Sequence, residues 1–152
     1  MNSKANDQQV GGEHYLKQTY QHWDFVLKTN LPYMEAQIVK YLSRWRAKNG
    51  VQDLHKALHF IDKLIEWYAG NTGQFMAECV DRYEVLSYLG INQIPTVESR
   101  VIMLIAWCSG LADLQTAHVA LQELINLETA CEPGPGYVDQ DRGELAARRV
   151  QR

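Results

Sequence analysis

Two consecutive stretches decide the fold: LPYMEAQIVKYLSRWRAKNG, residues 31–50, and VQDLHKALHFIDKLIEWY, residues 51–68. The first carries an apolar stripe at helical spacing, formed by Ile38, Tyr41, Leu42 and Trp45. The second carries a similar stripe, formed by Leu54, Ala57, Leu58, Ile61, Leu64, Ile65 and Tyr68. Each stretch is therefore predicted to be an amphipathic helix with one face turned inward.

The connection between these helices is short and contains Asn49-Gly50, which predicts an antiparallel helical hairpin. The two helices are expected at about residues 31–48 and 52–69. Asn30 is expected to cap the first helix, with Pro32 in its first turn. Gly50 suits a left-handed cap at the end of that helix.

Weaker patterns lie on both sides of the hairpin. Apolar residues around Trp23–Leu27 indicate a short helix before Asn30. About three further helices are predicted after it: one from Phe75 to near Gly90, one opening at Pro95-Thr96, and one capped by Asp113. No stretch alternates like a strand, so the predicted class is all-α. The predicted organisation is 1–9 disordered, 10–69 a helical domain, 73–131 a helical extension packing on it, and 132–152 a flexible tail.

Composition narrows the class of protein. A formal net charge of -3 over 152 residues disfavours a general nucleic-acid coat protein. No apolar run approaches the about 20 residues that span a bilayer, and MNSKANDQQVGG is not a secretory signal. The three cysteines are widely spaced, as in reduced cytoplasmic proteins. We expect a cytoplasmic protein with no membrane partner.

A cationic ridge is predicted on the outer side of the first hairpin helix. Lys40, Arg44 and Lys48 stand at i, i+4 and i+8, and Arg46 is nearby. Such a ridge can neutralise phosphate oxygens, while an aromatic ring of the adjacent face, such as Tyr41, can stack on a base. The alternative is a solvated helix face over ordinary aromatic core.

The second hairpin helix offers possible metal ligands. His55, His59 and Asp62 have a spacing that places them on one stripe, but His55 and His59 flank the buried stripe, which disfavours zinc. Asp53 and Asp62 are better candidates for Mg²⁺, which prefers carboxylates and substrate phosphates. For Asp53 the alternative is a helix cap, and for His59 a polar flank residue.

The N-terminal Gly11-Gly12-x-His14 could cradle an anion through backbone N–H groups and an imidazole. The chain has no GxxxxGK[ST], GxGxxG, GxSxG or HExxH motif. Conventional kinase, dehydrogenase and hydrolase scaffolds are therefore disfavoured.

Read together, these motifs resemble the bacteriophage SaV-like family, a phage domain of unknown function. The resemblance rests on Val10-Gly11-Gly12-x-His14-Tyr15, on the run from Ile38 through Lys40-Tyr41-Leu42-x-Arg44-Trp45-Arg46 to Gly50, and on Asp53-Leu54-x-Lys56-Ala57 with Phe60-Ile61-Asp62. It covers roughly residues 10–68. One departure is Ala36-Gln37, where many relatives have Gly-Asn.

The resemblance implies a phage protein of the host bacterial cytoplasm. Members include an atypical kinase that phosphorylates deoxynucleoside monophosphates without a Walker loop, and others connected with DNA binding and abortive infection. Carried onto this chain, it implies catalytic roles for Lys40, Arg44, Asp53 and Asp62, with Asp53 and Asp62 holding Mg²⁺ beside a nucleoside triphosphate donor. The implied nucleotide contacts are Gly11, Gly12, His14, Tyr15, Tyr41, Arg46, Lys48, Asn49 and His59.

Two alternatives to a kinase remain. One is a nucleotide-sequestering protein without turnover, and the other is a DNA-binding or host-interaction protein that counteracts bacterial defence. The net negative charge counts against DNA. A homo-oligomer is expected, because helical hairpins often bury their remaining apolar surface by self-association.

Overall fold

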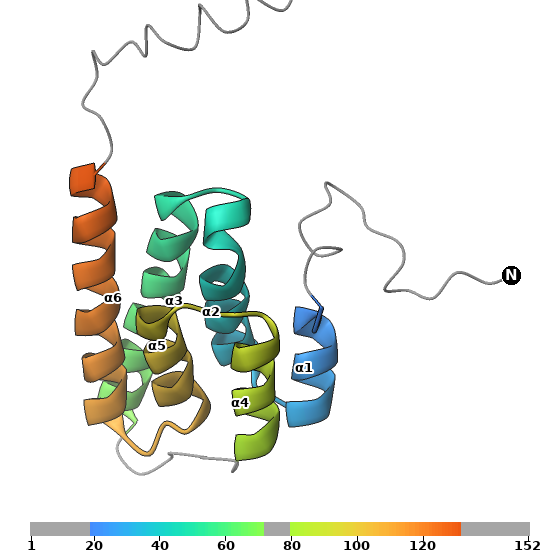
Figure 1. The fold of residues 1–152 in the computed structure, drawn as a ribbon. Coiled ribbons are helices and arrows are strands. Elements are labelled where there is room, and N and C mark those ends of the chain that lie inside the picture. Colours follow the sequence, from blue (N-terminus) through green and yellow to red (C-terminus); the bar gives the residue numbers. More distant parts are fainter. Residues whose placement is uncertain (1–18, 72–79, 132–152) are drawn as a thin grey trace, which may run out of the picture.

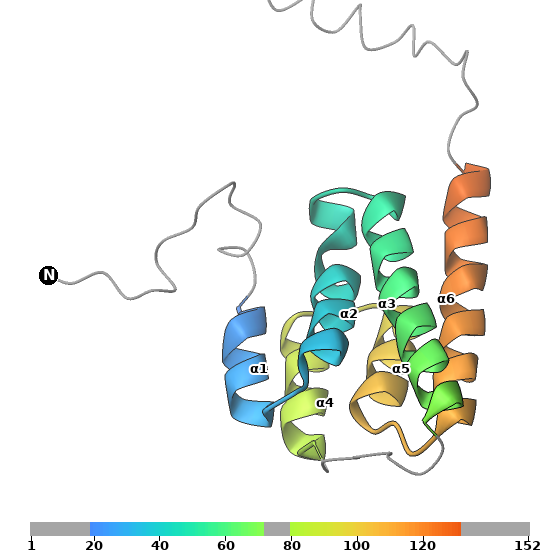
Figure 2. The same ribbon diagram turned by 180° about the vertical axis from the view of Figure 1, so that it is seen from behind.

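A computed structural model describes residues 19–71 and 80–131 of the chain (Figures 1 and 2). Within these ranges it contains helices and no strand, which confirms the all-α prediction. The elements are α1 (His22–Thr29), α2 (Tyr33–Arg44), the 3-10 turn η2 (Trp45–Ala47), α3 (Val51–Gly70), α4 (Arg82–Ile91), α5 (Thr96–Ala106) and α6 (Leu111–Cys131).

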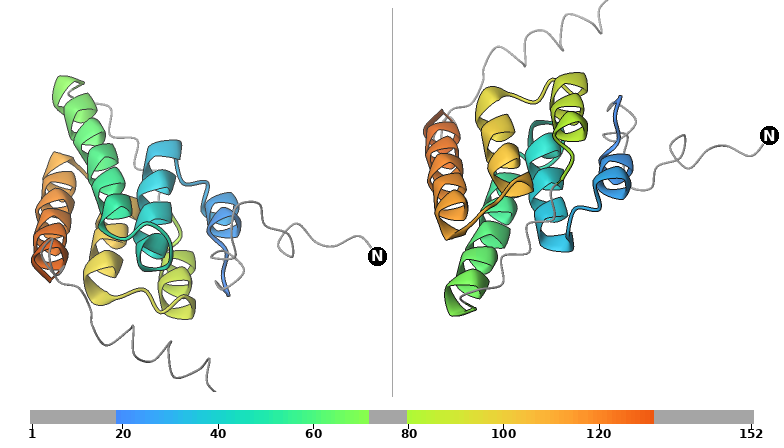
Figure 3. Two further views of the ribbon diagram at one scale, coloured as in Figure 1. Left: turned by 90° about the horizontal axis from the view of Figure 1, so that it is seen from above. Right: turned by 90° about the horizontal axis from the view of Figure 1, so that it is seen from below.

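Four helices close into a bundle. Helix α2 packs on α3 and α5, and α6 packs on the same two helices. Each of these neighbours runs antiparallel to the next, and α1 and α4 form a further antiparallel pair beside α2 and α5 (Figures 1 and 3). The hairpin α2–α3 therefore keeps an outer face that neither α5 nor α6 covers. No helix in the described ranges is long and apolar enough to cross a bilayer.

The predicted apolar stripes form the core. Ile38, Leu42 and Trp45 of the first stretch are buried, and so are Leu54, Leu58, Ile61 and Leu64 of the second. Burying these stripes against α5 and α6 is the main source of stability for the hairpin. Tyr41, Ile65 and Tyr68 are only partly buried and lie at the edges of the core.

Three helix starts differ from the sequence prediction. Asn30 is the left-handed C-cap of α1, and α2 begins at Tyr33 with Pro32 as its N-cap. Helix α6 begins at Leu111, so Asp113 lies within its first turn and accepts hydrogen bonds from the backbone and hydroxyl of Ser109. Asn30 therefore ends α1 instead of opening α2, and Asp113 contacts Ser109 from inside α6 instead of capping it. The third predicted helix appears as α4 from Arg82, and residues 75–79 lie outside the described ranges.

The end of α2 changes the predicted cationic ridge. The α-helix stops at Arg44 and the chain tightens into η2. Gly50 then adopts a φ of 56° and donates its N–H to the carbonyl of Trp45 at 2.8 Å. Because the α-helix does not continue to Lys48, the predicted i, i+4, i+8 ridge ends at Arg44. Lys48 belongs to the turn.

A buried carboxylate fastens this turn to the rest of the bundle. Glu98 of α5 is 1% exposed and accepts a hydrogen bond from the indole N–H of Trp45 at 2.9 Å. It also forms an ion pair with Arg46, whose guanidinium lies 3.8 Å from Glu128 of α6 and stacks over the Trp45 ring. The turn that joins α2 to α3 is therefore held by α5 and α6.

Replacing Glu98 tests this attachment. Glu98→Ala is expected to lower the free energy of unfolding by about 1–3 kcal/mol, because it leaves the buried indole N–H without an acceptor. Glu98→Gln keeps an acceptor and is expected to cost less. Urea unfolding at pH 7 measures both, with the exposed Glu66→Ala as a control that leaves the midpoint unchanged. Equal midpoints for wild type and Glu98→Ala would contradict the proposed attachment.

Candidate functional site

A cluster of charged residues lies on the outer face of the hairpin, where α2 ends and α3 begins. We call Lys40, Arg44, Asp53 and Lys56 the cationic cluster. Its centre is the carboxylate of Asp53, which accepts hydrogen bonds from Arg44 Nε at 3.0 Å and Lys56 Nζ at 3.0 Å. Asn49 Nδ2 donates a third at 2.8 Å. These contacts bring together residues from both helices and from the turn between them.

Asp53 is fully buried, and its contacts favour the charged carboxylate. Burial alone would raise the pKa of this carboxyl, but hydrogen bonds from Asn49 and Lys56 and the charge of Arg44 outweigh that effect and lower the pKa. It occupies the third position of α3, where a negative charge also favours the helix dipole. The cap residue itself is Gly50, so the predicted capping role of Asp53 is not observed.

The cations of the cluster outnumber its carboxylate by three to one. Arg44 is buried beneath the surface, whereas Lys40 and Lys56 are half-buried and reach solvent. Burial and the neighbouring charges of Arg44 and Lys48 lower the pKa of Lys40. A surface that already crowds positive charges favours an incoming anion, because the anion relieves their mutual repulsion.

The ring of Tyr41 organises the cations. Its centroid lies 4.9 Å from Arg44 Cζ, 5.6 Å from Lys56 Nζ and 5.8 Å from Lys40 Nζ. Phe60 stacks on the same ring with centroids 6.0 Å apart. Tyr41 is therefore in the predicted site, but its ring contacts protein cations and Phe60, so its contribution is to hold the lysines in place.

His22 of α1 is a member of the neighbourhood that the sequence analysis missed. Its Nδ1 is buried and has no hydrogen-bond partner within the described residues. Burial, with the charges of Lys40 and Arg44, lowers the pKa of His22 to about 4. A neutral imidazole thus lies at the edge of the cationic cluster. No spacing rule links α1 to α2, so only the packing of these helices reveals it.

The two predicted Mg²⁺ ligands are not brought together. Asp53 and Asp62 are nine residues apart on α3, which places them on opposite sides of the helix. Asp62 is exposed and lies 3.1 Å from His118 of α6, while Asp53 is already enclosed by three donors. Among the described residues, no group of three or more His, Cys, Asp or Glu is placed to hold a metal. The acidic pair does not fit a shared Mg²⁺ site.

The remaining predicted residues separate in space. Arg46 turns away toward Glu98 and Glu128, so it is not part of the cationic cluster. His59 is exposed on the flank of α3, one turn before Asp62. Ala36 is buried, but Gln37 is at the surface, with its Oε1 3.5 Å from Lys40 Nζ. The predicted contacts Gly11, Gly12, His14 and Tyr15 lie outside the described residues.

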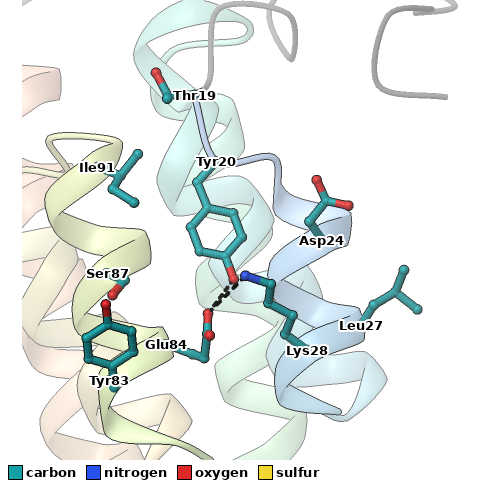
Figure 4. A pocket seen from close by; sticks show the side chains of 9 residues that line it. All are labelled: Thr19, Tyr20, Asp24, Leu27, Lys28, Tyr83, Glu84, Ser87 and Ile91. Atoms are coloured by element: carbon teal, nitrogen blue, oxygen red, sulfur yellow. Dashed lines mark hydrogen bonds and ion pairs between the residues drawn. The ribbon is translucent and has the colours of Figure 1, made fainter. Parts of the chain in front are cut away.

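A groove of about 500 Å³ lies between α1 and α4 (Figure 4). Inside it the hydroxyl of Tyr20 donates a 2.6 Å hydrogen bond to Glu84, and Lys28 Nζ lies 3.5 Å from the same carboxylate. The central carboxylate is thus satisfied by two neighbouring side chains. This contact joins α1 to α4, and in doing so it fixes the helix that carries His22.

Acid should reveal the role of Asp53. Its pKa is lowered in the folded protein, so its stabilising contribution is complete above its unfolded value of about 3.9 and is lost as the pH falls through the folded value. We expect Asp53→Asn to be less stable at pH 7 and to lose less further stability between pH 5 and pH 3. Urea unfolding at several pH values measures this. Parallel pH profiles for the two proteins would contradict it.

Nuclear magnetic resonance titration should detect the cations around His22. We expect a pKa near 4 for this imidazole, and a higher value in Lys40→Met, because one of the charges that oppose its protonation is removed. An unchanged His22 pKa in Lys40→Met would show that the two side chains do not interact.

Comparison with known proteins finds a family model that matches part of the chain. Residues 10–62 match the model of DUF3310, a family described as proteins of unknown function. No curated protein and no solved structure matches the chain. Within the described residues, the matched segment spans α1, α2 and most of α3, and it contains every member of the cationic cluster. The chain is thus similar to DUF3310 proteins over the segment that builds the candidate site.

Proposed function

We propose that the protein binds the phosphate groups of a nucleotide at the cationic cluster. The observation that carries this proposal is the charge balance of the cluster: Lys40, Arg44 and Lys56 surround the single carboxylate of Asp53. Arg44 and Asp53 form a buried ion pair, and the two lysines lie beside this pair within reach of solvent. Phosphate oxygens can accept hydrogen bonds from both ammonium groups at once.

The lysines of the cluster are also held by neighbouring side chains. Lys56 is held by Asp53, Lys40 lies beside Gln37, and both lie over the ring of Tyr41. Holding long side chains in position lowers the entropy that binding would otherwise cost. This order distinguishes the cluster from a set of lysines that move freely on a solvated helix.

The activity we propose is phosphoryl transfer to a deoxynucleoside monophosphate in a phage-infected bacterium, as the resemblance to the SaV-like family suggests. The γ-phosphoryl group of a nucleoside triphosphate would pass to a phosphate oxygen of the monophosphate, giving two diphosphates. Such a reaction needs mainly positioning and charge neutralisation from the protein. Lys40 and Lys56 supply both. We assign no step to Mg²⁺ held by Asp53 and Asp62, because these residues do not converge.

The separation of Asp53 from Asp62 supports a second candidate, which is nucleotide binding without turnover. Sequestration needs the cations of the cluster but no carboxylate pair. A third candidate, DNA binding, would use the same lysines on a phosphate backbone. The net charge of -3 argues against it.

We further propose that the protein self-associates. Several large apolar side chains remain exposed on α1, α4 and α6, among them Leu27, Tyr83, Leu86 and Leu127. Burying such residues between copies would remove apolar surface from water. Light scattering on the full chain tests this, and a monomeric mass would exclude it.

Phosphate binding can be tested with charge-matched variants. Lys40→Met and Lys56→Met are each expected to weaken binding of a nucleoside triphosphate by about tenfold or more, because each removes a charge-assisted contact. Lys28→Met loses the same charge in the α1–α4 groove and should bind as wild type does. Isothermal titration calorimetry gives the dissociation constants. Equal weakening by all three variants would indicate only a general charge effect.

A turnover assay then separates the candidate functions. Deoxynucleoside monophosphates, a nucleoside triphosphate and Mg²⁺ are incubated with wild type and with Lys40→Met. Diphosphate formed by wild type and lost in Lys40→Met supports the kinase. Nucleotide binding without product supports sequestration, and DNA affinity that falls steeply with salt supports DNA binding.

A further inference from the structure

The outer face of the hairpin carries an aromatic pair, Tyr33 and Phe60, beside the cationic cluster. Phe60 lies between Tyr41 and Tyr33, with ring centroids 6.0 Å and 6.4 Å away. Cations lie over the Tyr41 ring. The Tyr33 side chain, in contrast, is 69% exposed and contacts Phe60 edge to face. A large aromatic side chain at this exposure leaves most of its ring in water.

Tyr33 is aligned with the cations along α2. Lys40 and Arg44 follow Tyr33 by seven and eleven residues, which puts each of them within about 20° of Tyr33 around the helix. The Cα atoms of Tyr33 and Lys40 are separated by about 10 Å of helix rise. The face therefore has an aromatic end at the start of α2 and a cationic end where α2 stops, with Gln37 between them.

We propose that Tyr33, supported by Phe60, is the platform on which the base of the bound nucleotide stacks. This inference rests on the proposed phosphate binding at Lys40 and Lys56. A nucleotide is a ligand with a planar ring at one end and anionic phosphates at the other, and this face offers matching groups in the same order. Stacking on an aromatic ring is available to all four bases, because each has a π-face.

Two observations favour this occupant over a general apolar contact. First, the exposed ring is continuous with the cationic cluster through Phe60 and Tyr41, so a single ligand can touch both ends. Second, Phe60 fixes the Tyr33 ring from one side, and a ring held in place loses less freedom when a base stacks on it. Ligand chemistry that lacks a ring would leave this end of the face unused.

The test compares two probes that share a triphosphate group. A deoxynucleoside triphosphate and inorganic triphosphate are each titrated into the full-length protein by calorimetry. We expect the nucleotide to bind more tightly. Tyr33→Ala should weaken nucleotide binding by about tenfold, which is within the range that base–aromatic stacking reaches, and leave inorganic triphosphate unchanged.

Two further variants complete the design. Tyr33→Phe keeps the ring and should keep the affinity of wild type, whereas Tyr83→Ala removes a ring that is 75% exposed on α4 and should change neither probe. Thermal unfolding checks that all variants fold. Equal binding of both probes by wild type, or equal loss of both in Tyr33→Ala, would overturn the base platform but leave phosphate binding intact. Binding of neither probe would overturn the proposed function and this inference together.

Discussion

The ion pair between Arg44 and Asp53 is the contact on which the outer face of the hairpin depends. Arg44 is the last residue of α2, and Asp53 lies in the first turn of α3, so the pair closes the two helices where the chain reverses. Both side chains are almost completely removed from water. Removing one partner of such a pair destabilises the folded protein, because the other partner would remain as a buried charge without compensation. Its further donors, Asn49 and Lys56, satisfy the remaining lone pairs of the carboxylate.

This buried pair also determines which charges reach the surface. Arg44, which is buried, neutralises Asp53, and the more exposed Lys56 contacts the same carboxylate. Lys40 has no carboxylate of its own among these contacts, and its lowered pKa reflects burial and nearby positive charge. The cluster therefore presents an excess of positive charge in a fixed arrangement. The function we propose follows from that excess, and not from the total charge of the chain.

The second half of the described chain supports this face from behind. Glu98 of α5 holds Trp45 and Arg46, so the turn between α2 and α3 is tied to α5 and α6. The sequence predicts that Arg46 contacts a nucleotide, yet its guanidinium pairs with Glu98 and Glu128 and attaches the turn to α5 and α6. A separate hydrogen bond joins Tyr20, which precedes α1, to Glu84 of α4, and His22 at the start of α1 lies near the cations. Residues far from the cationic cluster in sequence thus help to hold the elements that carry its side chains.

The sequence by itself determined the helices and the hairpin, because the spacing of residues such as Ile38, Leu42, Leu54 and Ile61 follows the helical repeat regardless of what packs on it. It also identified Lys40, Arg44 and Asp53 as residues of interest. It could not show that Arg44 is buried or that α2 stops there, since Arg44 pairs with Asp53 of α3 and the residues that follow it are held by Glu98 of α5. Nor could it separate Asp53 from Asp62 in role, although the helical repeat already places them on opposite sides. The surroundings of His22 and the contact between Tyr33 and Phe60 were decided only by the tertiary structure, because side-chain contacts between α1, α2 and α3 join residues with no fixed spacing in the chain.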